Sequence, residues 1–278
     1  MALSVAELAQ KTFPLENWII PGLLTRQNTA FLMGPPKSAA KSWLLLDAAF
    51  SLSIGEAIWG ISGTKPPREM RTVYFTQEDT ERDAQSRIGA HLNGGGRKPN
   101  DRLWIVPKDL NYQLDTSTGV RGIAAELEDV HARAGEIDLI IFDPMRRILT
   151  GDENSSQTIA QIWSVIDKLH HYYDCAIVIS HHIVKPPRDR NGYDPADPYQ
   201  GRGSGDIYGG GDAFVMVVPG VGDEFSRKVE LHFESKRAKQ MPPASVKVDF
   251  HSGRVSYLGV GRPRNYESSS QANKIELV

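Results

Sequence analysis

The stretch Thr29-Ala-Phe-Leu-Met-Gly-Pro-Pro-Lys-Ser-Ala-Ala-Lys-Ser-Trp43 joins an apolar run to a proline-containing turn and a Lys-Ser pair. The apolar run predicts a buried strand that leads into the turn, and residues 43–54 predict a helix that Gly55 ends. This arrangement resembles a phosphate-binding loop, whose usual spacing is G-x-x-x-x-G-K-[ST]. Here five residues separate Gly34 from the residue before the lysine, and that residue is Ala40 rather than glycine. The stretch alone is compatible with a nucleotide site, with a damaged one, or with a turn that only resembles one.

Short apolar runs alternate with amphipathic stretches along the chain, which is typical of a sheet built from β-α units. We expect an α/β fold with a mostly parallel sheet, helices on both faces and antiparallel C-terminal strands. The predicted strands cover residues 29–33, 72–76, 103–106, 137–142 and 176–179, followed by antiparallel strands at 215–218, 228–233, 245–250 and 254–257. The predicted helices cover residues 43–54, 80–91, 119–135 and 157–173.

The composition is that of an ordinary globular protein, with 278 residues, of which 40% are apolar and 24% charged. The formal net charge of −2 excludes a global basic field, so any contact with nucleic acid must be local. The single cysteine, Cys175, lies in an apolar run and is expected to be buried rather than nucleophilic. No window approaches the ~18 apolar residues of a membrane span. We therefore expect no membrane partner and a cytoplasmic location.

Four of the predicted strands run into residues that carry chemistry. The loop at Gly34, the carboxylate of Glu78 and the carboxylate of Asp143 each follow a different strand, and a fourth strand precedes His181 and His182. In an open parallel sheet, ligands bind in the crevice at the carboxyl ends of the strands. We therefore expect these side chains to converge on one site.

The loop supplies the groups that phosphate binding requires. Backbone N–H groups at the start of a helix converge on phosphates, and a lysine neutralises the outer ones. Lys41 is that lysine, and the hydroxyl of Ser42 is a candidate ligand of Mg²⁺. The alternative interpretation is a proline-rich turn with a surface lysine. The predicted nucleotide-binding residues are Gly34, Lys37, Ser38, Ala39, Ala40, Lys41, Ser42 and Trp43.

Two carboxylates and a histidine pair complete the candidate site. Asp143 has the position of the carboxylate that holds Mg²⁺ in P-loop ATPases, although an aspartate before Pro144 also caps turns. Glu78 is a candidate to activate the attacking water, and its alternative role is that of a favourable acid at a helix N-terminus. The pair His181-His182 is compatible with sensing phosphate, binding a metal or only forming hydrogen bonds, and it lacks partners at metal-ligand spacing.

Five segments in a fixed order carry a resemblance to a known family. They are Lys41-Ser42, Phe75-Thr-Gln-Glu-Asp79, Ile140-Ile-Phe-Asp-Pro-Met-Arg-Arg147 with Asp152-Glu-Asn-Ser155, Ile177-Val-Ile-Ser-His-His182 and Gly201-Arg-Gly-Ser-Gly-Asp-Ile-Tyr-Gly-Gly-Gly-Asp212. Their order is similar to that in the RecA-type P-loop ATPases of mobile elements, and most of all to the RepA-like hexameric replicative helicases of plasmids and their phage relatives. The similarity extends from about Pro14 to Tyr257.

The resemblance implies a RecA-like ATPase domain at residues 29–260 that binds ATP and Mg²⁺. We expect residues 1–28 to pack on this domain and residues 261–278 to form a polar, flexible tail. Family members act as rings, so self-association is expected, with a hexamer as the implied assembly and ATP at subunit interfaces. His181, with His182 as the alternative, would replace the glutamine that couples the γ-phosphate to DNA-binding loops in relatives.

The resemblance also implies basic residues that a neighbouring subunit donates to the ATP site. The candidates are Lys236, Arg237 and Lys239, whose spacing departs from the Lys-x-Arg of the family. Such a residue stabilises charge on the transferring phosphoryl group. The alternative interpretation is a solvated basic hairpin.

The polar stretch at residues 185–205 is the expected contact with nucleic acid, because it is too long for an ordinary connection. In a ring, its basic side chains would line a central channel, and its tyrosines could stack on bases. Nearby aspartates dilute the positive charge, so we expect weak, salt-sensitive binding of single-stranded DNA. The candidate residues are Lys185, Arg188, Arg190 and Arg202 for phosphates and Tyr193 and Tyr199 for stacking.

Three classes of function follow from these motifs. The leading interpretation is an ATP-driven motor on single-stranded DNA, either a replicative helicase or a replication or repair ATPase of a plasmid, phage or other mobile element. The second is a nucleotide-binding regulatory or assembly ATPase with weak or no hydrolysis, which Ala40 favours. The third is a small-molecule phosphotransferase, and the lack of an evident acceptor-binding lid counts against it.

Overall fold

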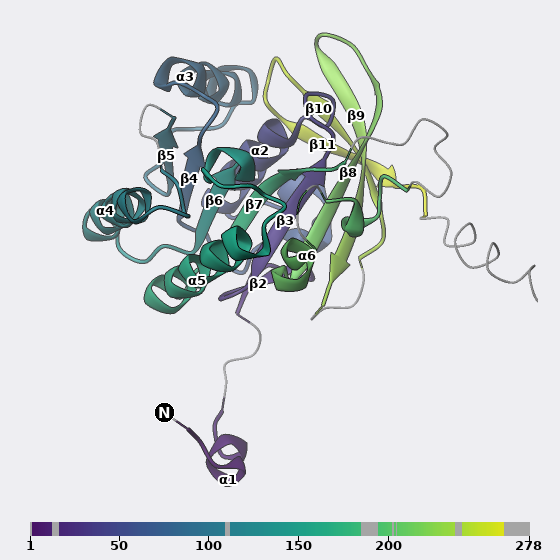
Figure 1. The fold of residues 1–278 in the computed structure, drawn as a ribbon. Coiled ribbons are helices and arrows are strands. Elements are labelled where there is room, and N and C mark those ends of the chain that lie inside the picture. The colour runs from purple at the N-terminus through teal and green to yellow at the C-terminus, as the bar shows by residue number, and fades with distance from the viewer. Residues whose placement is uncertain are drawn as a thin grey trace, which may run out of the picture.

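A large twisted sheet forms the centre of the molecule, with helices on either side (Figure 1). The computed structural model describes residues 2–12, 17–108, 112–184, 194–201, 203, 205–236 and 241–263. The strands of the sheet are β3 (Thr29–Gly34), β4 (Thr72–Thr76), β5 (Leu103–Pro107), β6 (Leu139–Asp143), β7 (Ala176–His182), β8 (Ala213–Gly222), β9 (Ser226–Ser235), β10 (Ala244–Asp249) and β11 (Val255–Val260).

The strands lie in the order β11-β10-β9-β8-β3-β7-β6-β4-β5. All pairings from β8 to β5 are parallel, whereas β9, β10 and β11 pair antiparallel. Strand β7 is inserted between β3 and β6, so the strand before the loop and the strand that ends at Asp143 are not neighbours. Every residue of β3 is buried, as expected for a central parallel strand with both faces covered.

Helices cover both faces of the sheet. One face carries α2 (Lys41–Ser53), and α3 (Glu81–Gly89) lies at its edge; the other carries α4 (Ser117–Ala134), α5 (Ser156–Tyr173) and α6 (Asp206–Gly210). Strand alternation separates the two cores, since Leu32 packs towards α2 and Phe31 packs towards α5. No helix in the described part of the chain is long and apolar enough to cross a membrane.

Short elements complete the described chain. A two-stranded sheet precedes β3, and its Ile19 and Leu24 are buried in the α2-side core. Ser4 caps the N-terminal helix, which has no buried residue. The elements are α1 (Val5–Ala9), β1 (Trp18–Ile20), β2 (Leu24–Thr25), η1 (Ile58–Gly60), η2 (Ser62–Thr64), η3 (Ala90–Gly94), η4 (Met145–Arg147) and η5 (Pro198–Gln200).

The predicted α/β class, with helices on both faces and antiparallel C-terminal strands, is confirmed. One strand direction was wrong, because the run at 215–218 belongs to β8, which pairs parallel with β3 and antiparallel only with β9. The connection from β7 to β8 includes α6 and returns the chain to the end of the sheet where β3 starts, so β8 runs parallel to β3. Strand β7 also continues past the predicted end at residue 179, because Ser180 and His182 pair with Leu32 and Gly34 of β3.

Candidate active site

The carboxyl ends of β3, β4, β6 and β7 meet at one edge of the sheet. Parallel pairing puts Gly34 opposite His182 and Thr76 opposite Asp143. Helix α2 begins at the same edge with Lys41. Four segments that are distant in sequence therefore bring their predicted site residues together, as the crevice rule for parallel sheets requires.

Two residues of the loop between β3 and α2 adopt a left-handed backbone conformation. Lys37 has φ 62°, and Ala40 has φ 51° and ψ 31°. A residue with a Cβ atom adopts this conformation at a cost of about 1–2 kcal/mol, whereas glycine adopts it freely. The backbone before Lys41 therefore has the conformation for which such loops use glycine, and Ala40 is strained there. Helix α2 has no side-chain cap among the described residues, so its first N–H groups are left for a ligand.

Contacts from β8 and β9 hold the loop in this shape. A Cβ atom added to Gly34 would lie 2.8 Å from the carbonyl oxygen of Val217 and 2.9 Å from the Cβ of Ala39, so only glycine fits. Ala39 is fully buried. Nη1 of Arg227 donates a hydrogen bond to the carbonyl oxygen of Ser38 at 3.0 Å. The loop is thus anchored from outside, although its sequence departs from the usual spacing.

The Lys41 side chain folds back against the loop that precedes it. Its Nζ donates to the carbonyl oxygens of Gly34 and Pro35 at 3.0 and 3.1 Å, and it lies 3.1 Å from Nδ1 of His182. Burial lowers the pKa of Lys41 to about 8, although the Asp143 and Glu78 carboxylates act in the opposite direction. A protonated lysine can only donate, so His182 Nδ1 is the acceptor. Lys41 therefore lies between the loop and the strand end of β7, in contact with both.

The Asp143 carboxylate is buried, and two hydroxyl groups fix its orientation. The Tyr74 hydroxyl donates to Oδ2 at 2.7 Å, and the Ser180 hydroxyl donates to Oδ1. Burial, followed by the charge of Asp143, raises the pKa of Tyr74 well above its usual range, so Tyr74 remains a donor. Tyr74 and Ser180 occupy the strands on either side of β6, on the same face as Asp143. One hydroxyl from each neighbouring strand thus leaves the carboxylate with free lone pairs for a cation.

Ser42 and Asp143 offer oxygen ligands of the kind that a magnesium ion shared with phosphate uses in P-loop proteins. Mg²⁺ prefers oxygen ligands and often uses only one or two protein groups besides water and phosphate. Ser42 lines a small cavity with Tyr74 and Asp79, and Tyr74 is bonded to Asp143. No group of three or more His, Cys, Asp or Glu side chains at metal-binding distances occurs among the residues described. The donor set therefore suits a metal shared with a nucleotide rather than one enclosed by side chains.

Glu78 stands at the mouth of the site and is 54% exposed. Its Oε1 lies 3.8 Å from Nε of Arg147, the residue that ends η4. Both side chains line a polar cavity of about 830 Å³ that opens next to His182. The remaining lining residues are Gln77, Lys108, Gln113, Arg146 and Leu149. Glu78 is thus accessible to water, as the predicted general base has to be.

The two histidines point to opposite faces of the sheet. His182 lies against Lys41 on the face that carries α2 and Asp143. His181 is 1% exposed and occupies the alternate position of β7, next to Met33, on the face that carries α5. The structure therefore brings His182, the alternative of the two candidates, to the site with Lys41, and it does not bring His181 there.

Two further predicted residues lie away from the loop. Trp43 packs against Phe250, with ring centroids 5.7 Å apart, and so belongs to the core beside α2. Lys236 follows β9, and its Nζ donates to the carbonyl oxygens of Tyr208 and Gly209 at 3.2 and 2.8 Å. Strand β9 separates Lys236 from Arg227 at the loop by about 30 Å, at ~3.3 Å per residue. Lys236 therefore cannot reach the loop of its own chain.

Several predicted residues lie outside the part of the chain that the structure describes. They are Arg237 and Lys239 of the basic hairpin and Lys185, Arg188, Arg190, Tyr193 and Arg202 of the predicted nucleic-acid contact. Of that contact, the structure describes Tyr199, which is 70% exposed and has its ring 3.9 Å from that of Tyr208.

Sequence reasoning missed the residues that support the site. Tyr74 and Ser180 hold Asp143, Arg227 holds the loop, and Arg147 pairs with Glu78. For Tyr74 and Ser180, the signal was present in the alternation of the strands, because each lies two residues before the end of its strand. For Arg227 no local pattern exists, since it is 189 residues from Ser38.

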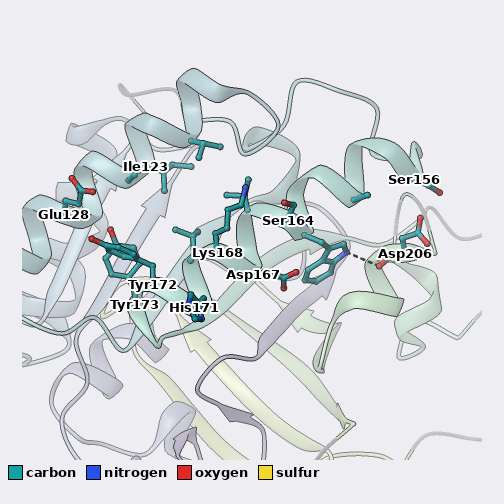
Figure 2. Close-up of a pocket in the computed structure, with 16 residues that line it drawn as sticks. Ile123, Glu128, Ser156, Ser164, Asp167, Lys168, His171, Tyr172, Tyr173 and Asp206 are labelled. Carbon is teal, nitrogen blue, oxygen red and sulfur yellow. Dashed lines mark hydrogen bonds between the residues drawn. The ribbon is translucent and has the colours of Figure 1, made fainter. Parts of the chain in front are cut away.

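A larger cavity lies elsewhere, between α4 and α5 on the other face of the sheet (Figure 2). Its volume is about 1130 Å³, and apolar side chains such as Ile123 and Tyr172 dominate its lining. At one end of this cavity, the indole Nε1 of Trp163 donates a hydrogen bond to the carbonyl oxygen of Asp206. The lining has none of the loop or carboxylate groups described above, so the size of a cavity does not identify the reactive site here.

The loop between β3 and α2, its lysine and the buried aspartate at the end of β6 define a P-loop NTPase. A family model described as an AAA domain matches residues 1–188, and the chain belongs to this family. Family membership supports nucleotide binding, usually with Mg²⁺, and ATPase activity in general. A search of curated proteins found no match to the chain.

Proposed function

We propose that this chain is an ATP-hydrolysing, RecA-like motor that acts on single-stranded DNA. Its role would be that of a replicative helicase, or of a replication or repair ATPase, in a plasmid, phage or other mobile element. The observation that supports ATP hydrolysis most directly is the convergence of Lys41, Asp143 and Glu78 at one edge of the sheet. The part of the proposal that concerns DNA rests on the order of motifs and on the resemblance to RepA-like helicases.

Each residue has a distinct task in this proposal. The first N–H groups of α2 and Lys41 bind the β- and γ-phosphates, and Ser42 and Asp143 hold Mg²⁺, which when bound neutralises charge on the phosphoryl oxygens. Glu78 orients the attacking water and accepts its proton. A γ-phosphate competes with His182 for Lys41, because both lie within reach of Nζ. His182 then exchanges Lys41 for another hydrogen-bond partner when ATP binds, and this rearrangement at the end of β7 would move the residues that follow the strand.

A neighbouring chain supplies a cation in this proposal. Lys236 lies at the edge of the sheet opposite to its own loop, so it can act only on the site of another copy. Two inactive variants, Glu78→Gln and Lys236→Met, test this arrangement when they are mixed. Turnover should partly return in the mixture, because some interfaces then combine an intact Glu78 with an intact Lys236. A mixture that stays inactive, although both variants still assemble, argues against donation by Lys236.

The decisive experiment measures ATP turnover with and without single-stranded DNA, together with the mass of the protein in solution. We expect turnover that DNA stimulates and a ring-sized mass. Glu78→Gln should lower the rate of ATP turnover by a factor of about 10²–10⁴, while ATP still binds. If turnover is indifferent to single strands, the motor proposal fails.

A second candidate function is a nucleotide-binding regulatory or assembly ATPase with weak or no hydrolysis. The left-handed backbone at Ala40 favours it, because a strained loop positions phosphate less well than a glycine loop. The two candidates differ in one outcome: the second binds ATP and assembles, but its turnover stays low with and without DNA.

A further inference from the structure

The polar cavity next to Glu78 has more cationic side chains than carboxylates among its described lining residues. Lys108, Arg146 and Arg147 line it, and Glu78 is the one carboxylate among its described lining residues. The pair between Arg147 and Glu78 is 3.8 Å long and exposed on both sides, and such pairs contribute little. Among the described residues that line the cavity, Lys108 and Arg146 therefore have no close carboxylate partner.

Some arginines elsewhere in the described chain have close carboxylate partners. Arg97 is buried against Asp47 at 3.1 Å, and Arg87 lies 3.1 Å from Asp79. Arg146, in contrast, contacts the carbonyl oxygens of Leu149 and Gly151 at 3.4 and 3.5 Å and forms no ion pair with any residue that the structure describes. Lys108 forms no ion pair within 4.0 Å among the residues that the structure describes, and its charge acts only at longer range on the exposed Asp83. Cations without a close carboxylate in a concave polar site indicate a ligand that brings the negative charge.

The position of the cavity indicates which anion this is. Glu78 and His182 belong both to the cavity and to the nucleotide site, and His182 contacts Lys41. The cavity is therefore continuous with the place where the γ-phosphate is expected, and its volume of about 830 Å³ leaves room for a further group. Guanidinium groups bind phosphate oxygens in a bidentate manner, and lysine adds a point charge.

We propose that Lys108, Arg146 and Arg147 form a second phosphate site, outside the position of the γ-phosphate. The proposal rests on the nucleotide site proposed above. Its ligand is a phosphate group from one of two sources, either the inorganic phosphate that leaves after hydrolysis or a phosphodiester of a single strand. A phosphate at Arg147 also competes with Glu78 for that guanidinium, so occupancy of the second site frees the general base.

The test uses the full chain loaded with Mg²⁺ and a non-hydrolysable ATP analogue, so that the first site is filled. Inorganic phosphate and a short single-stranded DNA are then titrated separately by calorimetry. Lys108→Gln and Arg146→Gln should each weaken binding of the true ligand about tenfold, the loss expected for one charge-assisted hydrogen bond. Arg121→Gln, which removes an exposed cation from α4, is the matched control and should bind as the wild type does.

Each result has a defined meaning. Weakening confined to phosphate identifies the reaction product as the ligand, and weakening confined to DNA identifies the phosphodiester. The proposal is overturned if neither probe binds the wild type, or if both variants bind both probes unchanged. The affinity for the ATP analogue, measured in the same variants, should stay within about twofold. If the analogue does not bind at all, the nucleotide site fails, and phosphate titrated into Lys41→Met still tests the second site by itself.

Discussion

Replacing Ala40 by glycine isolates the strain in the phosphate loop. Ala40 has φ 51°, a conformation that costs a residue with a Cβ atom about 1–2 kcal/mol. Glycine removes this cost but adds freedom to the unfolded chain, which offsets about 0.4–1 kcal/mol of the gain. The net expectation is a free energy of unfolding that rises by about 0.5–1 kcal/mol, which corresponds to about 2 °C in Tm for a chain of this size.

The same substitution should improve nucleotide binding. A loop without the methyl group can bend closer to the phosphates, whereas the strain relieved at residue 40 is present with and without ligand and so adds nothing to the affinity. Denaturant unfolding and titration with a fluorescent ATP analogue measure the two quantities separately. A gain in affinity without a gain in turnover would favour the regulatory candidate over the motor.

The neighbouring alanine provides the control. Ala39 is fully buried and its φ is not positive, so Ala39→Gly removes a packed methyl group and relieves no strain. It should lower the free energy of unfolding by about 1 kcal/mol. The reasoning is refuted if Ala40→Gly destabilises the protein as Ala39→Gly does, because the methyl group of Ala40 would then contribute packing rather than strain.

Three further substitutions test the supports of the site. Lys41→Met should reduce ATP affinity by more than about tenfold and should stabilise the chain at neutral pH, because it removes a buried charge. Burial lowers the pKa of Lys41 from 10.5 to about 8, so the unfolded chain binds more protons than the folded chain between these pH values. The free energy of unfolding of the wild type should therefore rise as the pH rises from about 8 to 10.5. Denaturant midpoints of Lys41→Met should not show this rise. Tyr74→Phe removes a hydrogen bond to Asp143, the carboxylate proposed to hold Mg²⁺, and should raise the Mg²⁺ concentration for half-maximal nucleotide binding about tenfold; an unchanged Mg²⁺ dependence would remove Tyr74 from the site. Arg227→Met releases the carbonyl oxygen of Ser38 and should weaken ATP binding about tenfold, whereas the exposed neighbour Lys228→Met should not; equal effects of both would point to charge rather than to the loop anchor.

The sequence predicts the elements of this fold well because apolar periodicity is a local property. Strands at 72–76 and 103–106 and the helix at 157–173 match β4, β5 and α5 within about one residue. Strand order and direction are not local, since they depend on which strands pair after collapse. For this reason the parallel direction of β8 was missed, whereas its existence was predicted.

The site shows the same division between local and distant information. The convergence of the loop, Glu78 and Asp143 was predicted because each lies at the end of a strand, and strand ends are visible in the sequence. The choice between His181 and His182 depended on where β7 ends. Had the strand been continued by three residues, alternation from Ile179 would have placed His182 on the side of Lys41. The loop anchor at Arg227 comes from a separate hairpin and leaves no trace in the local pattern.

The exposure of Glu78 bears on how hydrolysis could be controlled. A general base and its water work best where bulk solvent is excluded, because charges interact more strongly at low dielectric. Glu78 is 54% exposed and is paired only weakly with Arg147 in a single chain, so an isolated chain lacks the enclosure that fast hydrolysis requires. Lys236 lies too far from its own loop to close the site. In the proposed function, a second copy of the chain would place its Lys236 over the strand ends that carry Glu78. This copy would exclude solvent from Glu78 and also supply the missing cation. Turnover per chain should then rise steeply with protein concentration, and ATP binding should not.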